Sequence, residues 1–243
     1  NGGVGAYSIG TRHAWRFAAV QAMAGAPSWR QYTGGRPRDD EDALLRTLSA
    51  LDLAENSVNT DFRFYHGRVD GGPMKPRFVD EFARELDRLG LRRTQTWYET
   101  GHDILYLVHR HGRIYDDLAS VRRDPRPREV RLVTGDYRAN RQHWLTVTRL
   151  EDPPNLARVT GSVEASTVDL EIDGALALRV GLSDAPLGSD GEIVIRVGSA
   201  EVFRGPRAPL GDAVHLVHRD GRWQVGFPSE APTSPVKRPG LSG

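Results

Sequence analysis

The sequence predicts a chain of two parts, an α/β region over residues 1–124 and an all-β region over residues 128–228. In the first part, apolar runs of strand length alternate with amphipathic runs of helix length, which is typical of a parallel sheet with crossover helices. In the second part, short runs alternate apolar and polar residues, at a spacing that suits a β-sandwich. A charged, proline-rich linker over residues 123–127 separates the two parts.

The first part is expected to alternate helices and strands. Residues 3–13 form a glycine-containing helix, and residues 17–24 form a short buried strand. The acidic residues 39–42 indicate the start of a helix, because negative side chains oppose the helix dipole there. Further strands are expected at residues 60–65 and 93–98, and further helices at residues 76–89 and 112–122.

The second part is expected to contain strands only. They fall at residues 130–133, 143–150, 156–159, 167–172, 175–182, 192–197, 213–217 and 222–225. Asp173-Gly174 lies between two of these runs and predicts a tight hairpin turn. Residues 229–243 are rich in proline and serine, which predicts a disordered tail.

Composition excludes several classes of function. The formal net charge of +1 gives no electrostatic bias toward nucleic acid or an anionic membrane, and no apolar run approaches the ~20 residues of a membrane span. The absence of cysteine excludes disulfides, thiolate catalysis and Cys-ligated zinc. His109 and His111 have no third ligand at a useful spacing, so we expect no metal and no cofactor.

The opening residues predict the position of a nucleophile. Asn1-Gly2-Gly3, followed by a helix of small residues and then a strand, is how a chain leaves the nucleophile elbow G-x-S-x-G. The serine is then expected immediately before Asn1, and an upstream segment of the same protein would complete the fold. Ser8 is the alternative nucleophile, but the motif needs a strand before it and Ser8 follows a glycine-rich stretch.

Asp70 and His102 follow two consecutive predicted strands. The order Ser…Asp…His is that of α/β-hydrolases, so the predicted fold class is the C-terminal part of an α/β-hydrolase followed by an all-β sandwich. Asp70 has an alternative interpretation as a turn aspartate. His66 is expected to form a loop hydrogen bond, and Asp103 to cap a helix.

Three motifs resemble prolyl-oligopeptidase-like serine hydrolases over residues 1 to about 122. They are Asn1-Gly2-Gly3 with the later Arg16-Phe17 phrase, His66-Gly67-x-x-Asp70, and Gly101-His102-Asp103. The resemblance implies that Asp70 is the triad acid and His102 the base. Two phrases depart from the family pattern, Ala14-Trp15 in place of Pro-Asp and Gly71-Gly72-Pro73 in place of a more hydrophobic phrase. The β-rich region resembles the C-terminal appendage of some bacterial members.

The sequence therefore predicts a serine hydrolase of ester or peptide bonds. His102 would take the proton of the serine, Asp70 would fix the tautomer of His102, and the backbone N–H of Asn1 would be one oxyanion donor. The alternative is a non-catalytic binding protein, in which a degenerate hydrolase half carries a β-sandwich that binds carbohydrate or protein. The residue before Asn1 distinguishes the two hypotheses.

Overall fold

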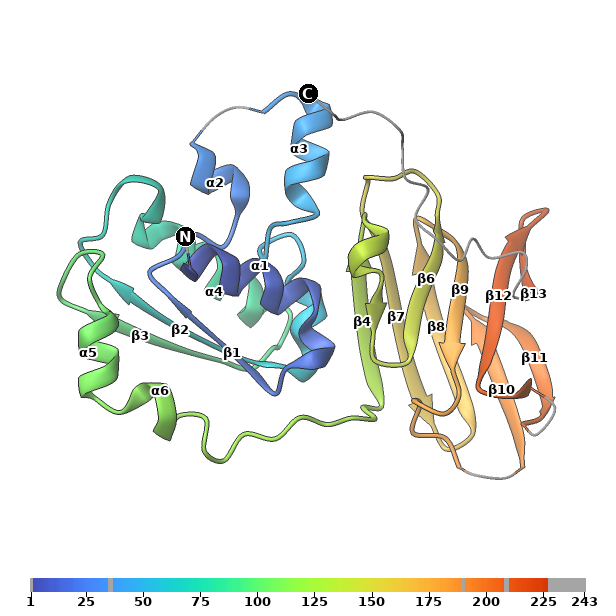
Figure 1. Cartoon of the computed structure of the whole chain (residues 1–243). Helices are drawn as coiled ribbons and strands as arrows, with labels where there is room; N and C mark the ends of the chain where they lie inside the picture. Colours follow the sequence, from blue (N-terminus) through green and yellow to red (C-terminus); the bar gives the residue numbers. More distant parts are fainter. Residues whose placement is uncertain (1, 35–36, 189–190, 208–209, 227–243) are drawn as a thin grey trace.

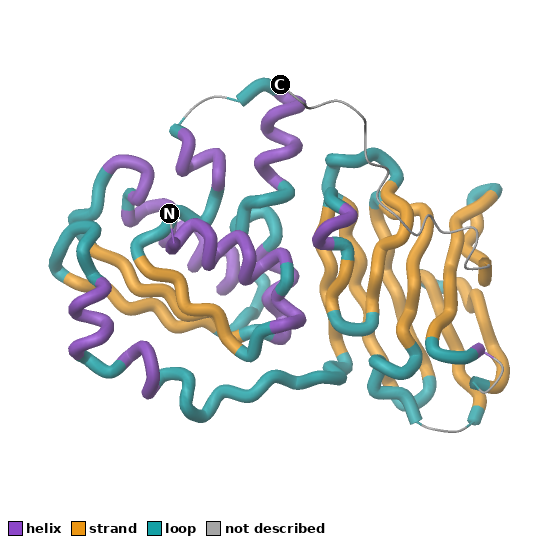
Figure 2. Tube along the Cα trace, in the orientation of Figure 1, coloured by secondary structure: helices purple, strands orange, loops and turns teal. Residues whose placement is uncertain are grey.

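The computed structural model describes residues 2–34, 37–188, 191–207 and 210–226. Within them the strands form one parallel sheet of three strands and two further sheets of five strands each (Figures 1 and 2). The predicted fold class is wrong, because no α/β-hydrolase fold is evident in this arrangement. The sequence pattern specified the local parallel pairing of three strands, whereas most strands belong to sheets that pair mainly in antiparallel fashion.

The parallel sheet has the order β1 (Ala19–Met23), β2 (Asp61–Gly67), β3 (Arg93–Tyr98). Helices α1 (Gly2–Arg12) and α4 (Pro76–Arg88) contribute to the core on one face of it. The centre of that core is aromatic: Tyr7 stacks on Phe62 and meets Phe82 edge-on. Such rings bury much apolar area in fixed geometries, so they hold α1 and α4 in position on this face of the sheet.

Several short helices connect these elements. They are η1 (Ala14–Arg16), α2 (Trp29–Thr33), α3 (Asp39–Arg46), η2 (Ala54–Asn59), η3 (Gly72–Met74), α5 (Leu105–Arg110) and α6 (Arg113–Asp116). The helix expected at residues 112–122 is wrong in extent, because α6 covers only its first turn and α5 precedes it. Gly112 has a φ of +67°, a left-handed conformation that separates α5 from α6.

The β region consists of two sheets with the orders β11-β10-β8-β7-β4 and β13-β12-β9-β6-β5. Their strands are β4 (Glu129–Thr134), β5 (Arg141–Gln142), β6 (Leu145–Leu150), β7 (Ala157–Glu164), β8 (Thr167–Asp173), β9 (Ala175–Gly181), β10 (Glu192–Val197), β11 (Ala200–Pro206), β12 (Ala213–Arg219) and β13 (Arg222–Gly226). The two sheets share one apolar core, in which Trp144 is fully buried and donates its Nε1–H to the carbonyl of Pro127 at 2.9 Å. A short helix η4 (Tyr137–Ala139) joins β4 to β5.

The hairpin predicted at Asp173-Gly174 is wrong. β8 pairs with β7 and β10, whereas β9 pairs with β6 and β12, so Asp173-Gly174 carries the chain from one sheet to the other. Gly174 does adopt the positive φ that the dipeptide suggests. Turn chemistry therefore predicted the sharp turn, but it could not tell which strands pair on either side of it. The predicted tail over residues 229–243 lies outside the described residues.

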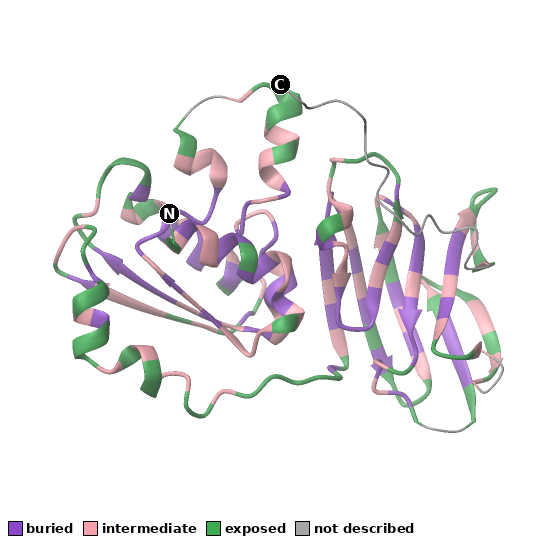
Figure 3. Ribbon diagram, viewed as in Figure 1, coloured by how far each residue is buried: buried purple, intermediate pink, exposed green. Residues whose placement is uncertain are grey.

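The two regions meet along β4. Asn56 in η2 donates to the carbonyl of Val133 at 3.0 Å and accepts from the N–H of Val133 at 2.6 Å, and Asn59 donates to the carbonyl of Glu129 at 2.7 Å. These amides occupy the edge of β4 that is left unpaired by the strands of the described residues. Buried residues are seen on both sides of this junction in Figure 3.

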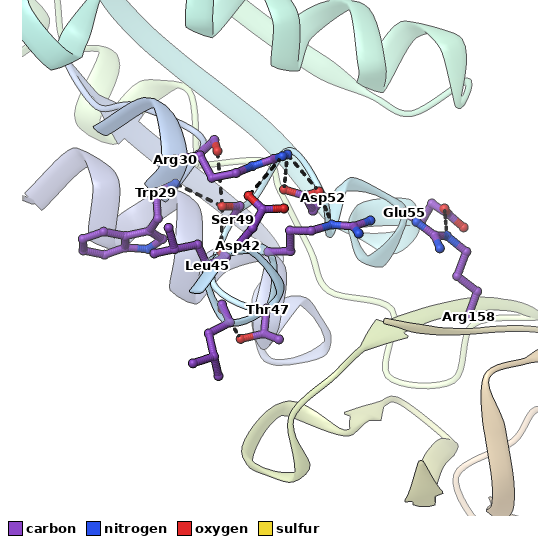
Figure 4. Close-up of polar contacts among 12 residues, drawn as sticks. Trp29, Arg30, Asp42, Leu45, Thr47, Ser49, Asp52, Glu55 and Arg158 are labelled. Atoms are coloured by element: carbon purple, nitrogen blue, oxygen red, sulfur yellow. Dashed lines mark hydrogen bonds and ion pairs between the residues drawn. The ribbon is translucent and has the colours of Figure 1, made fainter. Parts of the chain in front are cut away.

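An ionic network fixes the segment that precedes the junction (Figure 4). Arg30 contacts Asp42 at 3.4 Å and Asp52 at 3.3 Å, and Arg46 contacts the same Asp52 at 3.1 Å. Further along, Glu55 pairs with Arg158 of β7 at 3.2 Å. The network therefore ties α2 and α3 to the residues that lead into η2.

Candidate active site

The loops after β2 and β3 run side by side. The two strands are parallel, with His66 opposite Trp97 and Gly67 opposite Tyr98. The hydrogen bonding continues past the strand ends. The N–H of Arg68 donates to the backbone carbonyl of Tyr98 at 2.9 Å, and the N–H of Val69 donates to that of Thr100 at 3.2 Å. Residues that follow the two strands are thereby brought to the same edge of the sheet.

Glycine at position 67 is required by this close approach. A Cβ atom there would lie 2.0 Å from the carbonyl oxygen of Gly101 and 2.4 Å from that of Thr100. Both neighbours are backbone atoms, which cannot move without separating the two loops. The backbone contact at Gly67 therefore sets the distance between the Asp70 loop and the His102 loop.

Asp70 and His102 form a carboxylate–imidazole pair. His102 Nδ1 lies 3.0 Å from Asp70 Oδ2, while Asp70 Oδ1 accepts the N–H of Gly71 at 2.8 Å. The Asp70 side chain is 5% exposed and that of His102 is 61% exposed. A buried carboxylate on Nδ1 favours the tautomer with the proton on that nitrogen, and this leaves Nε2 free to accept a proton.

His102 lines a cavity of about 550 Å³ together with the start of α1. Gly3 allows α1 to lie this close to the end of β1, because a Cβ on it would lie 2.1 Å from the carbonyl oxygen of Met23. The other lining residues are mostly small or apolar: Gly2, Ala6, Gln21, Met23, Ala24, Asp103, Ile104 and Leu105. The first turn of α1 and the imidazole of His102 therefore open onto the same space.

His66 lies behind Asp70 in the core. Its Nε2 is 2.7 Å from the carbonyl oxygen of Met74, so the expected loop hydrogen bond is confirmed. Met74 in turn packs with Trp29 and Tyr32, whose rings meet edge-on at 5.5 Å. The two aromatics therefore support the loop that carries Asp70, and they are not among the residues that line the His102 cavity.

Other predicted site residues have different positions. Asn1, the predicted oxyanion donor, lies outside the described residues. Ser8 is 8% exposed within α1 and is not among the residues that line the cavity. Asp103 does not cap a helix, because α5 begins two residues later with Ile104 at its N-cap and no side-chain cap bond. The role of Met74 could not be predicted from the sequence, because a hydrogen bond between a strand residue and a later loop carbonyl follows no spacing pattern.

Two further features bear on the class of site. In the part of the chain that the structure describes, no cluster of three or more His, Asp or Glu side chains is arranged to hold a metal ion. No described helix combines the length and apolarity that crossing a membrane requires.

Comparison with known proteins gives no assignment. No protein-family model matches the chain, and a search of the curated proteins finds no significant match. Any function must therefore be argued from the site itself.

Proposed function

We propose that the chain supplies the acid and the base of a serine hydrolase that cleaves ester or peptide bonds. The observation that carries the proposal is the Asp70–His102 pair, with 3.0 Å between Oδ2 and Nδ1, beside a cavity shared with the start of α1. A serine immediately before Asn1 would enter this cavity at the N-terminal end of α1. Asp70 then holds the His102 tautomer, and Nε2 takes the serine proton and returns it to the leaving group.

The start of α1 suits the charge that forms in such a reaction. Peptide N–H groups at a helix start point away from the helix and carry partial positive charge. In the proposal the N–H of Asn1 donates to the oxyanion of the tetrahedral intermediate, and a donor of this kind is worth about 3 kcal/mol. The resemblance to prolyl-oligopeptidase-like hydrolases is then a likeness of chemistry, carried by Asp70, His102 and the opening glycines.

The proposal also includes a partner segment. Among the described strands only β2 pairs with β1, so the other edge of β1 presents backbone groups that a strand can bind. A segment that precedes Asn1 is proposed to pair there, because a serine before Asn1 needs a chain that leads into α1 beside β1. The substrate is the second partner.

The test uses the protein with its residues before Asn1 included. A fluorophosphonate probe should label the serine before Asn1, and nitrophenyl esters and peptide anilides should report turnover. His102→Ala and Asp70→Asn should each lower turnover by on the order of 10⁴. The matched controls Ser8→Ala and His109→Ala should leave it unchanged, because Ser8 lies inside α1 and His109 is exposed on α5.

Two results would overturn the proposal. Turnover that survives His102→Ala would remove the base from the mechanism. A residue other than serine or cysteine before Asn1, together with an unlabelled protein, would instead support the non-catalytic binding protein.

A further inference from the structure

His66 is buried between Asp70 and the loop that follows it. Its side chain is 1% exposed, and its Nε2 lies 2.7 Å from the carbonyl oxygen of Met74 and 3.7 Å from Asp70 Oδ2. A carbonyl oxygen can only accept a hydrogen bond, so Nε2 carries the proton and donates it. The N–H group therefore ties β2 to Met74, on the far side of the loop that holds Asp70.

The protonation state of His66 is fixed by its surroundings. Nδ1 is buried and has no hydrogen-bond partner, so a second proton there would be a buried donor without an acceptor. Burial lowers the pKa of His66 below the usual histidine value, and the Met74 carbonyl and the Asp70 carboxylate oppose this only in part. His66 is thus a neutral imidazole with its single N–H on Nε2.

This N–H binds the far end of the loop that carries Asp70. Asp70 Oδ1 accepts a hydrogen bond from the N–H of Gly71, and Asp70 Oδ2 accepts one from Nδ1 of His102. The loop from Asp70 to Met74 is closed by the His66 bond at its far end. We propose that His66 is a positioning residue, whose Nε2–H holds this loop closed so that Asp70 Oδ2 stays directed at His102 Nδ1.

The inference rests on the proposed function for its catalytic consequence, but not for its structural one. His66→Gln keeps an amide N–H that reaches the Met74 carbonyl, whereas the shorter His66→Asn does not reach it. Both side chains are neutral and polar, so the pair isolates the hydrogen bond from other effects of replacing the imidazole. His66→Phe keeps a ring against Trp97, which His66 meets edge-on at 5.7 Å, and removes the donor.

The first measurement needs no turnover. Nitrogen NMR of the chain itself reports which ring nitrogen of His102 carries the proton. In the wild type and in His66→Gln the proton should be on Nδ1, facing Asp70. In His66→Asn and His66→Phe it should redistribute toward Nε2, while melting curves and amide spectra show that the variants remain folded.

The second measurement uses the protein with its preceding segment. His66→Asn should lower kcat by about 10- to 100-fold, as expected for a misdirected catalytic group, and KM should stay within about twofold. His66→Gln should recover most of kcat. An unchanged His102 tautomer in His66→Asn would overturn the inference, whereas a changed tautomer in a protein without turnover would overturn the proposed function alone.

Discussion

Gly67 is the residue on which the separation of Asp70 and His102 depends most directly. Its missing Cβ leaves room for the backbone of Gly101, the residue before His102. The sequence places glycine at both positions but gives no sign that they touch, because contact between two loops is a property of the pairing of β2 and β3. The sequence could predict that Asp70 and His102 lie at one sheet edge, since parallel strands end together. It could not predict the spacing that lets them bind.

Gly67→Ala should therefore separate the two loops. We expect a loss of about 1–3 kcal/mol in the free energy of unfolding, the usual cost of overpacking, and a longer Asp70–His102 distance. Gly71→Ala is the matched control, because its backbone is extended and a Cβ there meets nothing within 4 Å. Denaturant unfolding and the His102 tautomer measure the two effects, and equal stability of the two variants would contradict the prediction.

His143 gives the β region a dependence on pH. It is buried and has a φ of +46°, and burial, with a smaller effect from the Arg123 charge, lowers its pKa to about 4. In the unfolded chain a histidine has its ordinary pKa of about 6.5. Between these values the unfolded state binds a proton that the folded state does not, so stability falls as the pH is lowered from about 6.5 to about 4.

His143→Asn should flatten this part of the stability curve. Asparagine tolerates the positive φ and does not titrate. Between about pH 6.5 and about pH 4 the free energy of unfolding of the variant should therefore fall by on the order of 1–2 kcal/mol less than that of the wild type, after allowance for solvent screening. The measurement is urea unfolding at several pH values. The exposed His109→Asn should follow the wild-type curve, and a His143→Asn curve with the wild-type slope would contradict the assignment.

At the scale of elements, β4 depends on side chains from the other region. Its outer edge is bound by the amides of Asn56 and Asn59 rather than by a strand. The alternating pattern of residues 130–133 predicted β4 itself. That asparagine side chains bind this edge could not be predicted, because Asn56 is 77 residues distant from Val133. An asparagine at such a position is also typical of an ordinary turn.

Asn56→Ala should expose this dependence. It leaves the buried N–H and C=O of Val133 without partners, which costs about 1–3 kcal/mol for each unsatisfied group. Hydrogen exchange should show the Val133 amide losing protection before the rest of β4. Asn155→Ala, on the exposed turn before β7, is the control and should have little effect on stability.

At the scale of the whole molecule, the two regions are joined by more than the linker. Arg12 pairs with Asp136, Trp15 N–H donates to Gln142 Oε1 at 3.0 Å, and the Arg141 guanidinium lies 4.6 Å from the centre of the Trp15 ring. Sequence patterns predicted the change from mixed to all-β character near residues 123–127. They predict the wrong fold class, because alternating strands and helices indicate a parallel sheet but not how many strands it contains, and the parallel sheet has three.

These contacts predict that the two regions unfold together. The amides of the central strands β2 and β9 should exchange with the same opening free energy and the same dependence on denaturant, as in a single cooperative unit. Two separate transitions, or earlier exchange of β2, would show instead that the junction is too weak to couple the regions.

The binding of β4 by Asn56 also has a consequence during synthesis, because the chain emerges from the ribosome with Asn56 ahead of β4. Ribosomes release the N-terminal part of a chain first, and it begins to fold while the rest is synthesised. Asn56 and Asn59 thus emerge well before β4, whose unpaired edge would otherwise be free to bind the strands of neighbouring nascent chains. Asn56 and Asn59 are therefore already available when β4 emerges, and they can bind its edge before a strand of a neighbouring chain on the same polysome does.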